Sequence, residues 1–164
     1  MRAFIGLGSN LGERETTVRE ALEQISQLTD TTLVRVSSLY DSEAMGPEEQ
    51  PDFVNAVAQV ETGLSARQLL WNLLLIEKRL GRARSQKWGP RTIDLDLLLF
   101  GDQVIDDDDL SVPHPEITRR SFVLAPLAEL EPGLIHPLTG QSVTVHLSQL
   151  HTRPPVRRPT RLWN

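Results

Sequence analysis

Two aspartates separated by one residue, Asp94 and Asp96, are the side chains in this sequence best placed to do chemistry. They lie in the run TIDLDLLLF at residues 92–100, whose length and apolar composition are typical of a buried strand. Side chains alternate across a strand, so both carboxylates are expected on one face, with Cα atoms about 6.5 to 7 Å apart. The opposite, core face is expected to carry Ile93, Leu95, Leu97 and Leu99.

Like charges at this spacing repel by about 2 to 3 kcal/mol at an effective dielectric constant near 20, so the pair needs a positive partner. Carboxylates with no His or Cys close by in the sequence favour Mg²⁺, which also binds phosphate oxygens, and this spacing is compatible with two metal ions. The alternative is an exposed strand face whose aspartates meet water or arginine. The preceding loop favours phosphate chemistry because it carries four cations: Arg82, Arg84, Lys87 and Arg91.

Composition limits the classes of function. The 164 residues are 39% hydrophobic and 24% charged, which is typical of one globular domain. A net charge of -5 argues against general binding to nucleic acid or to anionic membranes. The absence of cysteine excludes disulfides and thiol catalysis and is compatible with a cytoplasmic location. No apolar run approaches the roughly 18 residues that span a bilayer.

Hydrophobic periodicity predicts strands at residues 2–7, 32–40, 53–61 and 92–100 and a helix at about 13–28. A capping box at Ser65 and Gln68 predicts a second helix that ends near Gly81, with Glu77 on or beside its buried face. This order of elements predicts an α+β fold with a ferredoxin-like core.

The C-terminal third is predicted to contain a helix at 118–130, interrupted at Pro126, and a last strand at 143–147. Residues 1–150 are expected to form the domain. The segment 151–164, with three prolines and four arginines, is expected to be a poorly ordered tail, and a docking segment is the alternative.

Four blocks of the sequence resemble the 6-hydroxymethyl-7,8-dihydropterin pyrophosphokinases of folate biosynthesis in order and spacing. They are GLGSNLG at 6–12, GPEEQPDFVNAV at 46–57, LGRARSQKWGPRTIDLDLLLFG at 80–101 and LSVPHPEITRRSFVLAPLAEL at 110–130. The resemblance implies a three-layered α/β/α fold around a mainly antiparallel sheet. It also implies two Mg²⁺ ions and transfer of diphosphate from ATP to the pterin hydroxymethyl group, giving AMP and the pterin diphosphate.

The resemblance extends to individual site residues. It identifies Asp94 and Asp96 as metal ligands and Arg82 and Arg91 as triphosphate-binding arginines. The nucleotide contacts it implies are Glu77, Arg84, Trp88, His114 and Arg120. The pterin contacts it implies are Ser42, Ala44, Met45, Phe53, Asn55 and Phe122, the two phenylalanines stacking on the ring. The sequence departs from the common family pattern at Phe53, which is often Tyr, and at 42–45, where prolines are common.

The implied partners are therefore ATP and a reduced pterin, with no nucleic acid and no membrane. The chain is expected to be a monomer that associates with folate-pathway enzymes. Two other classes stay open at this point: a two-metal nucleotidyltransferase or nuclease, and a catalytically silent ligand-binding protein. A salt-dependent nucleic-acid binding assay tests the first, and AMP production tests the second.

Overall fold

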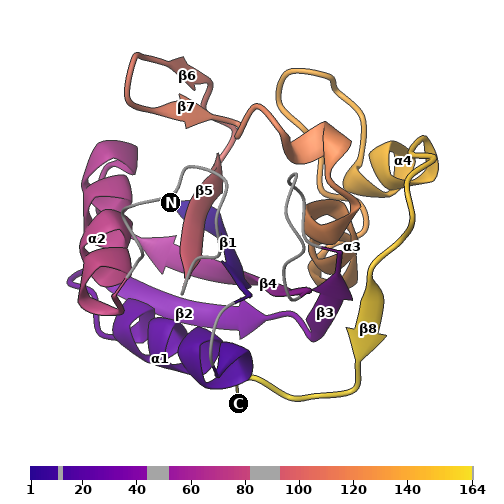
Figure 1. Cartoon of the computed structure of the whole chain (residues 1–164). Helices are drawn as coiled ribbons and strands as arrows, with labels where there is room; N and C mark the ends of the chain where they lie inside the picture. Colours follow the sequence, from indigo (N-terminus) through magenta and orange to yellow (C-terminus); the bar gives the residue numbers. More distant parts are fainter. Residues whose placement is uncertain (11–12, 44–51, 82–92, 164) are drawn as a thin grey trace.

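The chain folds into an antiparallel sheet with helices on both faces (Figure 1). The computed structural model describes residues 1–10, 13–43, 52–81 and 93–163. The strands are β1 (Arg2–Ser9), β2 (Thr31–Val36), β3 (Leu39–Ser42), β4 (Phe53–Thr62), β5 (Asp94–Phe100), β6 (Ile105–Asp106), β7 (Ser111–Val112) and β8 (Val156–Arg158). The helices are α1 (Arg14–Ser26), α2 (Ala66–Arg79), the 3₁₀ helix η1 (Ile117–Arg119), α3 (Ser121–Leu130) and α4 (Val143–Ser148).

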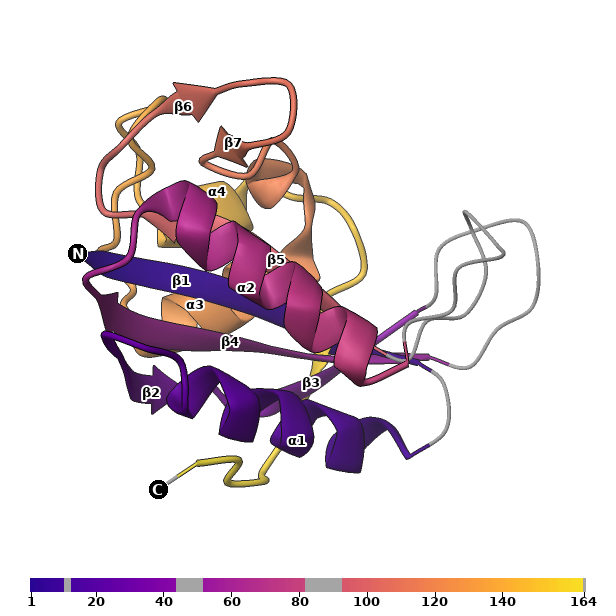
Figure 2. The same ribbon diagram turned by 90° about the vertical axis from the view of Figure 1, so that its left-hand side faces the viewer.

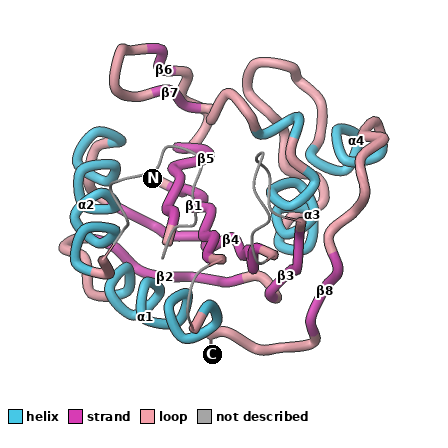
Figure 3. The backbone as a smooth tube through the Cα atoms, in the orientation of Figure 1, coloured by secondary structure: helices cyan, strands magenta, loops and turns pink. Residues whose placement is uncertain are grey.

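The main sheet has the strand order β5-β1-β4-β3-β8. Strand β2 also pairs with β4, along a different part of that strand from the part that pairs with β3. Helices α1 and α2 cover one face, and α3 and α4 lie on the other (Figures 2 and 3). Each layer encloses a core, one around Ile5, Leu22 and Leu73 and the other around Phe4 and Leu124. The predicted α+β, three-layered, ferredoxin-like fold is confirmed.

A β-bulge divides strand β5 into two halves. Phe4 of β1 is paired with Leu99, but the next residue, Ile5, is paired with Leu97, so Leu98 is an extra residue on β5. The bulge reverses the alternation of side chains. Leu99 therefore packs with Leu98 in the core beneath α3, and its predicted place on the opposite face is wrong. The register at Asp96, on the near side of the bulge, is unaffected.

Helices α1 and α2 lie where the periodicity predicts them. Ser65 Oγ accepts from the Gln68 N–H, and the Gln68 side chain accepts from the Ser65 N–H, which completes the capping box. The helix predicted over 118–130 is broken at Arg120, between η1 and α3, rather than at Pro126. None of the helices in the described part of the chain has the length and apolar composition needed to cross a bilayer.

Two predictions near the C-terminus are wrong. Residues 143–148 form helix α4 instead of a strand, because Ser142 Oγ accepts from the Val145 N–H and so starts a helix. Residues 156–158 of the expected poorly ordered tail form β8 on the edge of β3, and Leu162 is buried in the core beneath α1 and α2. An edge strand has unpaired backbone groups, and the tail pairs with them.

Candidate active site

A cleft of about 610 Å³ runs from α3 across the sheet to α2 at the β5 edge and has two glycines of β1 as part of its lining. Directly paired residues point to the same face of a sheet. Gly8 is paired with Asn55 on one side and Asp94 on the other, and Gly6 is paired with Asp96. The central strand thus places no side chain between the carboxylates of β5 and the amide of β4. The space above it is open to a ligand that reaches both.

The two aspartates of β5 both line this cleft and are partly exposed. Leu95, between them, is buried in the core on the opposite face, as the alternation predicts. Glu77 of α2 is 3% exposed, and its Oε2 accepts from the Leu95 N–H at 2.7 Å. Among the described residues β5 is an edge strand of the sheet, so this carboxylate satisfies a backbone donor that no neighbouring strand there accepts from. Glu77 therefore fixes the backbone that carries Asp94 and Asp96.

His114 and Arg120, from the segment between β7 and α3, both lie near Asp96. The His114 backbone N–H donates to the Leu98 carbonyl at 2.8 Å, and its Nδ1 accepts from the Glu116 N–H at 3.1 Å. Burial, aided by the Arg120 charge and opposed by Asp96, lowers the pKa of His114. Arg120 lies 3.9 Å from Asp96 Oδ2, a long and partly exposed pair that contributes little to stability.

The other side of the cleft carries an amide and two aromatic rings. Asn55 is 5% exposed, and its Nδ2 donates to Ser42 Oγ at 2.6 Å. Phe53 and Phe122 both line the cleft, from β4 and α3. The Arg120 guanidinium carbon lies 5.7 Å from the centroid of the Phe122 ring, a cation–π contact. This side is therefore apolar with one oriented amide, and the opposite side is acidic.

The structure brings together nine of the predicted site residues, and all nine line this one cleft: Ser42, Phe53, Asn55, Glu77, Asp94, Asp96, His114, Arg120 and Phe122. The remaining six lie outside the described residues: Ala44, Met45, Arg82, Arg84, Trp88 and Arg91.

Several cleft residues had no predicted role. Leu70 and Leu74 of α2 and Leu110, before β7, contribute an apolar wall beside the aspartates. The hairpin that carries Leu110 is bound to α2 by Arg67, which pairs with Asp109 at 2.6 Å and Asp107 at 2.8 Å. The sequence contained one usable signal: glycines at positions 6 and 8 of a strand leave one face bare.

A family model described as 7,8-dihydro-6-hydroxymethylpterin-pyrophosphokinase (HPPK) matches residues 4–132. The chain belongs to this family. Membership gives the reaction: HPPK transfers diphosphate from ATP to the hydroxymethyl group of 6-hydroxymethyl-7,8-dihydropterin, a step in folate biosynthesis. The predicted family and activity are confirmed, and the nuclease and silent-binder alternatives are set aside.

Relatives of similar length carry the HPPK activity in their names. The 2-amino-4-hydroxy-6-hydroxymethyldihydropteridine pyrophosphokinase of Haemophilus influenzae is 47% identical over 147 residues, which cover 90% of this chain and 91% of that protein. The enzyme of the same name from Pseudomonas aeruginosa is 49% identical over 133 residues, covering 81% and 82%.

Solved structures are similar to this chain in fold. The wild-type HPPK-DHPS of Plasmodium falciparum matches with a TM-score of 0.72 at 14% identity, over 90% of this chain. The match covers 44% of that longer chain, so this chain spans less than half of it. At this identity the likeness concerns the fold alone, and it agrees with the three-layered HPPK architecture.

Proposed function

We propose that the cleft above β1 carries out the HPPK reaction, with ATP and Mg²⁺ on the Asp94–Asp96 side and the pterin on the Asn55 side. One observation supports this division. Acidic and amide groups face the same open space from β5 and β4, and the residues of the intervening strand β1 that are paired with Asp96, Asp94 and Asn55 are glycines, Gly6 and Gly8. The two substrates would therefore meet above the glycines.

The carboxylates of Asp94 and Asp96 suit magnesium. No group of three or more His, Cys, Asp or Glu side chains able to hold a metal is found among the described residues. Mg²⁺ does not need such a group, since it commonly takes one or two protein carboxylates and completes its shell with water and substrate phosphates. Bound Mg²⁺ supplies charge neutralisation at the phosphates and acidifies a coordinated hydroxyl. Two ions are proposed because the two carboxylates lie on one face, one residue apart.

The chain's own residues orient the two substrates. Glu77 holds the Leu95 amide, so both aspartates keep a fixed position relative to the sheet. Arg120, beside Asp96, is placed to take up negative charge on a nucleotide phosphate. Arg82 and Arg91 are proposed to do the same on the basis of their sequence positions. Catalysis then consists of alignment and charge compensation, and no dedicated general base is assigned.

The pterin side is proposed to recognise a flat heterocycle. Phe53 and Phe122 offer ring faces for stacking, and Asn55 offers an amide that can donate and accept along one edge of the ring. The hydrogen bond from Asn55 to Ser42 fixes the orientation of this amide. Buried polar groups with fixed geometry reject ligands that leave them unpaired, which gives selectivity for a pterin.

The experiment that tests this function is incubation of the chain with ATP, Mg²⁺ and 6-hydroxymethyl-7,8-dihydropterin, followed by mass spectrometry. AMP and the pterin diphosphate are expected in equal amounts. Asp96→Ala should keep the fold, checked by circular dichroism, and lose at least about a thousandfold in turnover because an electrostatic contribution to the transition state is removed. Near-normal turnover in this variant would refute the metal assignment.

We also propose a partner for this chain. The name of the Plasmodium falciparum HPPK-DHPS protein favours an association of this chain with a neighbouring enzyme of the same pathway. A monomeric state and a cytoplasmic location remain sequence predictions. Light scattering after size-exclusion chromatography measures the oligomeric state directly.

A further inference from the structure

The C-terminal segment extends the same sheet that carries the cleft. Strand β8 pairs antiparallel with β3, with Arg158 opposite Leu39, Arg157 opposite Tyr40 and Val156 opposite Asp41. The family model ends at residue 132, so β8 lies beyond the residues that define HPPK membership. Without β8, the four-residue strand β3 would form the edge of the sheet and leave its outer backbone groups unpaired.

A bidentate ion pair between Arg158 and Asp41 holds β8 in register on β3. Arg158 Nε lies 2.5 Å from Asp41 Oδ2, and its terminal nitrogen lies 2.7 Å from Asp41 Oδ1. Both side chains are partly shielded, with 36% of Arg158 and 26% of Asp41 exposed. Bidentate arginine–carboxylate pairs are stronger and more directional than single contacts. This pair therefore opposes both sliding and fraying of β3.

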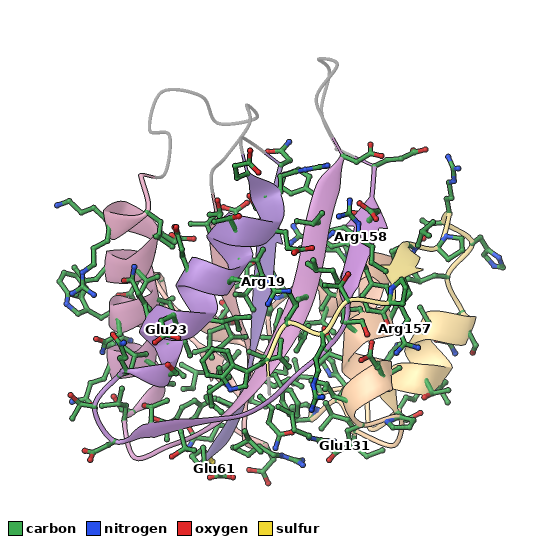
Figure 4. The ribbon with its side chains drawn as sticks, turned by 90° about the horizontal axis from the view of Figure 1, so that it is seen from below. Arg19, Glu23, Glu61, Glu131, Arg157 and Arg158 are labelled. Atoms are coloured by element: carbon green, nitrogen blue, oxygen red, sulfur yellow. The ribbon has the colours of Figure 1, made fainter. Side chains whose placement is uncertain are left out.

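The end of the tail is also attached to the body of the protein. Arg19 of α1 donates to the Leu162 carbonyl at 3.3 Å and to the Arg161 carbonyl at 3.1 Å. Leu162 is 5% exposed and packs in the core beneath α1 and α2. Figure 4 shows Arg19 beside the C-terminal trace. β8 is therefore held by its pairing with β3 and by the attachment of the residues that follow it to α1 and the core.

The ion pair lies next to the substrate-facing end of β3. Asp41 is followed directly by Ser42, which is paired with Phe53 and accepts the hydrogen bond from Asn55. The Asn55 amide can keep one orientation only while Ser42 stays in place. Ser42 is the last residue of its strand, and β8 pairs only as far as Asp41, so the position of Ser42 depends on its pairing with Phe53 and on the support that the Arg158–Asp41 pair gives to the preceding residue.

We infer that β8, through the Arg158–Asp41 pair, positions the Ser42–Asn55 hydrogen bond for recognition of the pterin. Arg158 touches neither substrate in this arrangement and is a positioning residue. The inference rests on the proposed function, because it assigns the Asn55 side of the cleft to the pterin. It predicts that a change at Arg158 affects the two substrates unequally.

The test compares Arg158→Ala with Arg161→Ala in the full-length chain. Both remove one arginine from the same segment, and the Arg161 side chain has no ion pair within the described residues. For R158A we expect the KM for the pterin to rise about five- to tenfold with the KM for ATP unchanged, as loss of one oriented polar contact implies. For R161A both constants should equal those of the wild type.

Exchange of the two charges gives a second measurement. Asp41→Arg alone should raise the pterin KM at least as much as R158A, and the double variant Asp41→Arg/Arg158→Asp should return it to within about twofold of wild type. Recovery of this kind depends on the pair itself and not on general loss of stability. If R158A does not fold, Arg158→Lys replaces it, with a smaller but still pterin-selective rise.

Three results would overturn the inference while the wild-type chain makes AMP: an equal rise in both KM values, no rise in R158A, or the same rise in R161A. Absence of AMP with the wild-type chain would instead refute the proposed function.

Discussion

Replacement of Gly8 by alanine should weaken pterin binding without weakening the fold. A Cβ added at Gly8 would lie 3.1 Å from Asn55 Oδ1 and 3.7 Å from a Phe53 ring carbon. The first distance is shorter than normal contact, so the Asn55 amide must move by a few tenths of an ångström. That amide is held by a 2.6 Å hydrogen bond to Ser42, which the movement would lengthen or bend.

The expected loss of pterin affinity in Gly8→Ala follows from the interactions that change. Weakening one hydrogen bond that orients a nearly buried amide costs about 1 kcal/mol, which corresponds to about a fivefold increase in the pterin Kd. Stability should change little. Alanine restricts the unfolded chain and so stabilises a compatible strand position by about 0.4 to 1 kcal/mol, which offsets the contact strain.

Gly6→Ala is the matched control, since it adds the same methyl group two residues away on the same strand face. A Cβ at Gly6 would lie 3.4 Å from the two terminal carbons of Leu98, which is ordinary van der Waals contact. Isothermal titration with the pterin and thermal unfolding should be measured for both variants. An unchanged pterin Kd in Gly8→Ala, or an equal increase in Gly6→Ala, would refute the reasoning.

Three further results are expected. Phe122→Ala should raise the pterin Kd more than the ATP Kd, and equal losses would contradict its stacking role; titration of each ligand separates the two. Glu77→Leu should lower the free energy of unfolding by about 1 to 3 kcal/mol, because the Leu95 N–H loses its acceptor, and urea denaturation measures this. Burial and the neighbouring His146 lower the pKa of His136. Since the unfolded chain binds that proton first, the contribution of His136 to the free energy of unfolding should be constant above about pH 6.5 and fall below it. His136→Asn should reduce the fall in the free energy of unfolding below about pH 6.5, which urea denaturation at several pH values measures.

The sequence predicted the side-chain directions in the first half of β5 better than those after the β-bulge. Alternation placed Asp94 and Asp96 on one face correctly, because the alternating pattern there agrees with burial of the intervening Leu95 in the core. It failed at Leu99, because the bulge arises from the pairing of β5 with β1, and no pattern within β5 alone reveals an extra residue.

The tail was mispredicted for a similar reason. Its prolines and arginines are typical of disorder when considered alone, yet Arg158 finds its partner at Asp41, 117 residues earlier in the chain. Such contacts depend on the tertiary arrangement, which composition does not encode. Conversely, the stacking residues Phe53 and Phe122 could be proposed only from the family resemblance, since aromatic side chains at strand and helix positions most often belong to a core.

The position of β1, whose Gly6 and Gly8 face the cleft between β5 and β4, has one more consequence, which concerns the length of the substrate. Backbone hydrogen bonds keep neighbouring strands about 4.8 Å apart, so the lines of β5 and β4 are separated by about 9.6 Å. No side-chain substitution alters this interval, because it belongs to the peptide backbone. A pterin analogue with one methylene added before its hydroxyl should therefore bind at the aromatic end and yet place its oxygen beyond the reacting phosphorus.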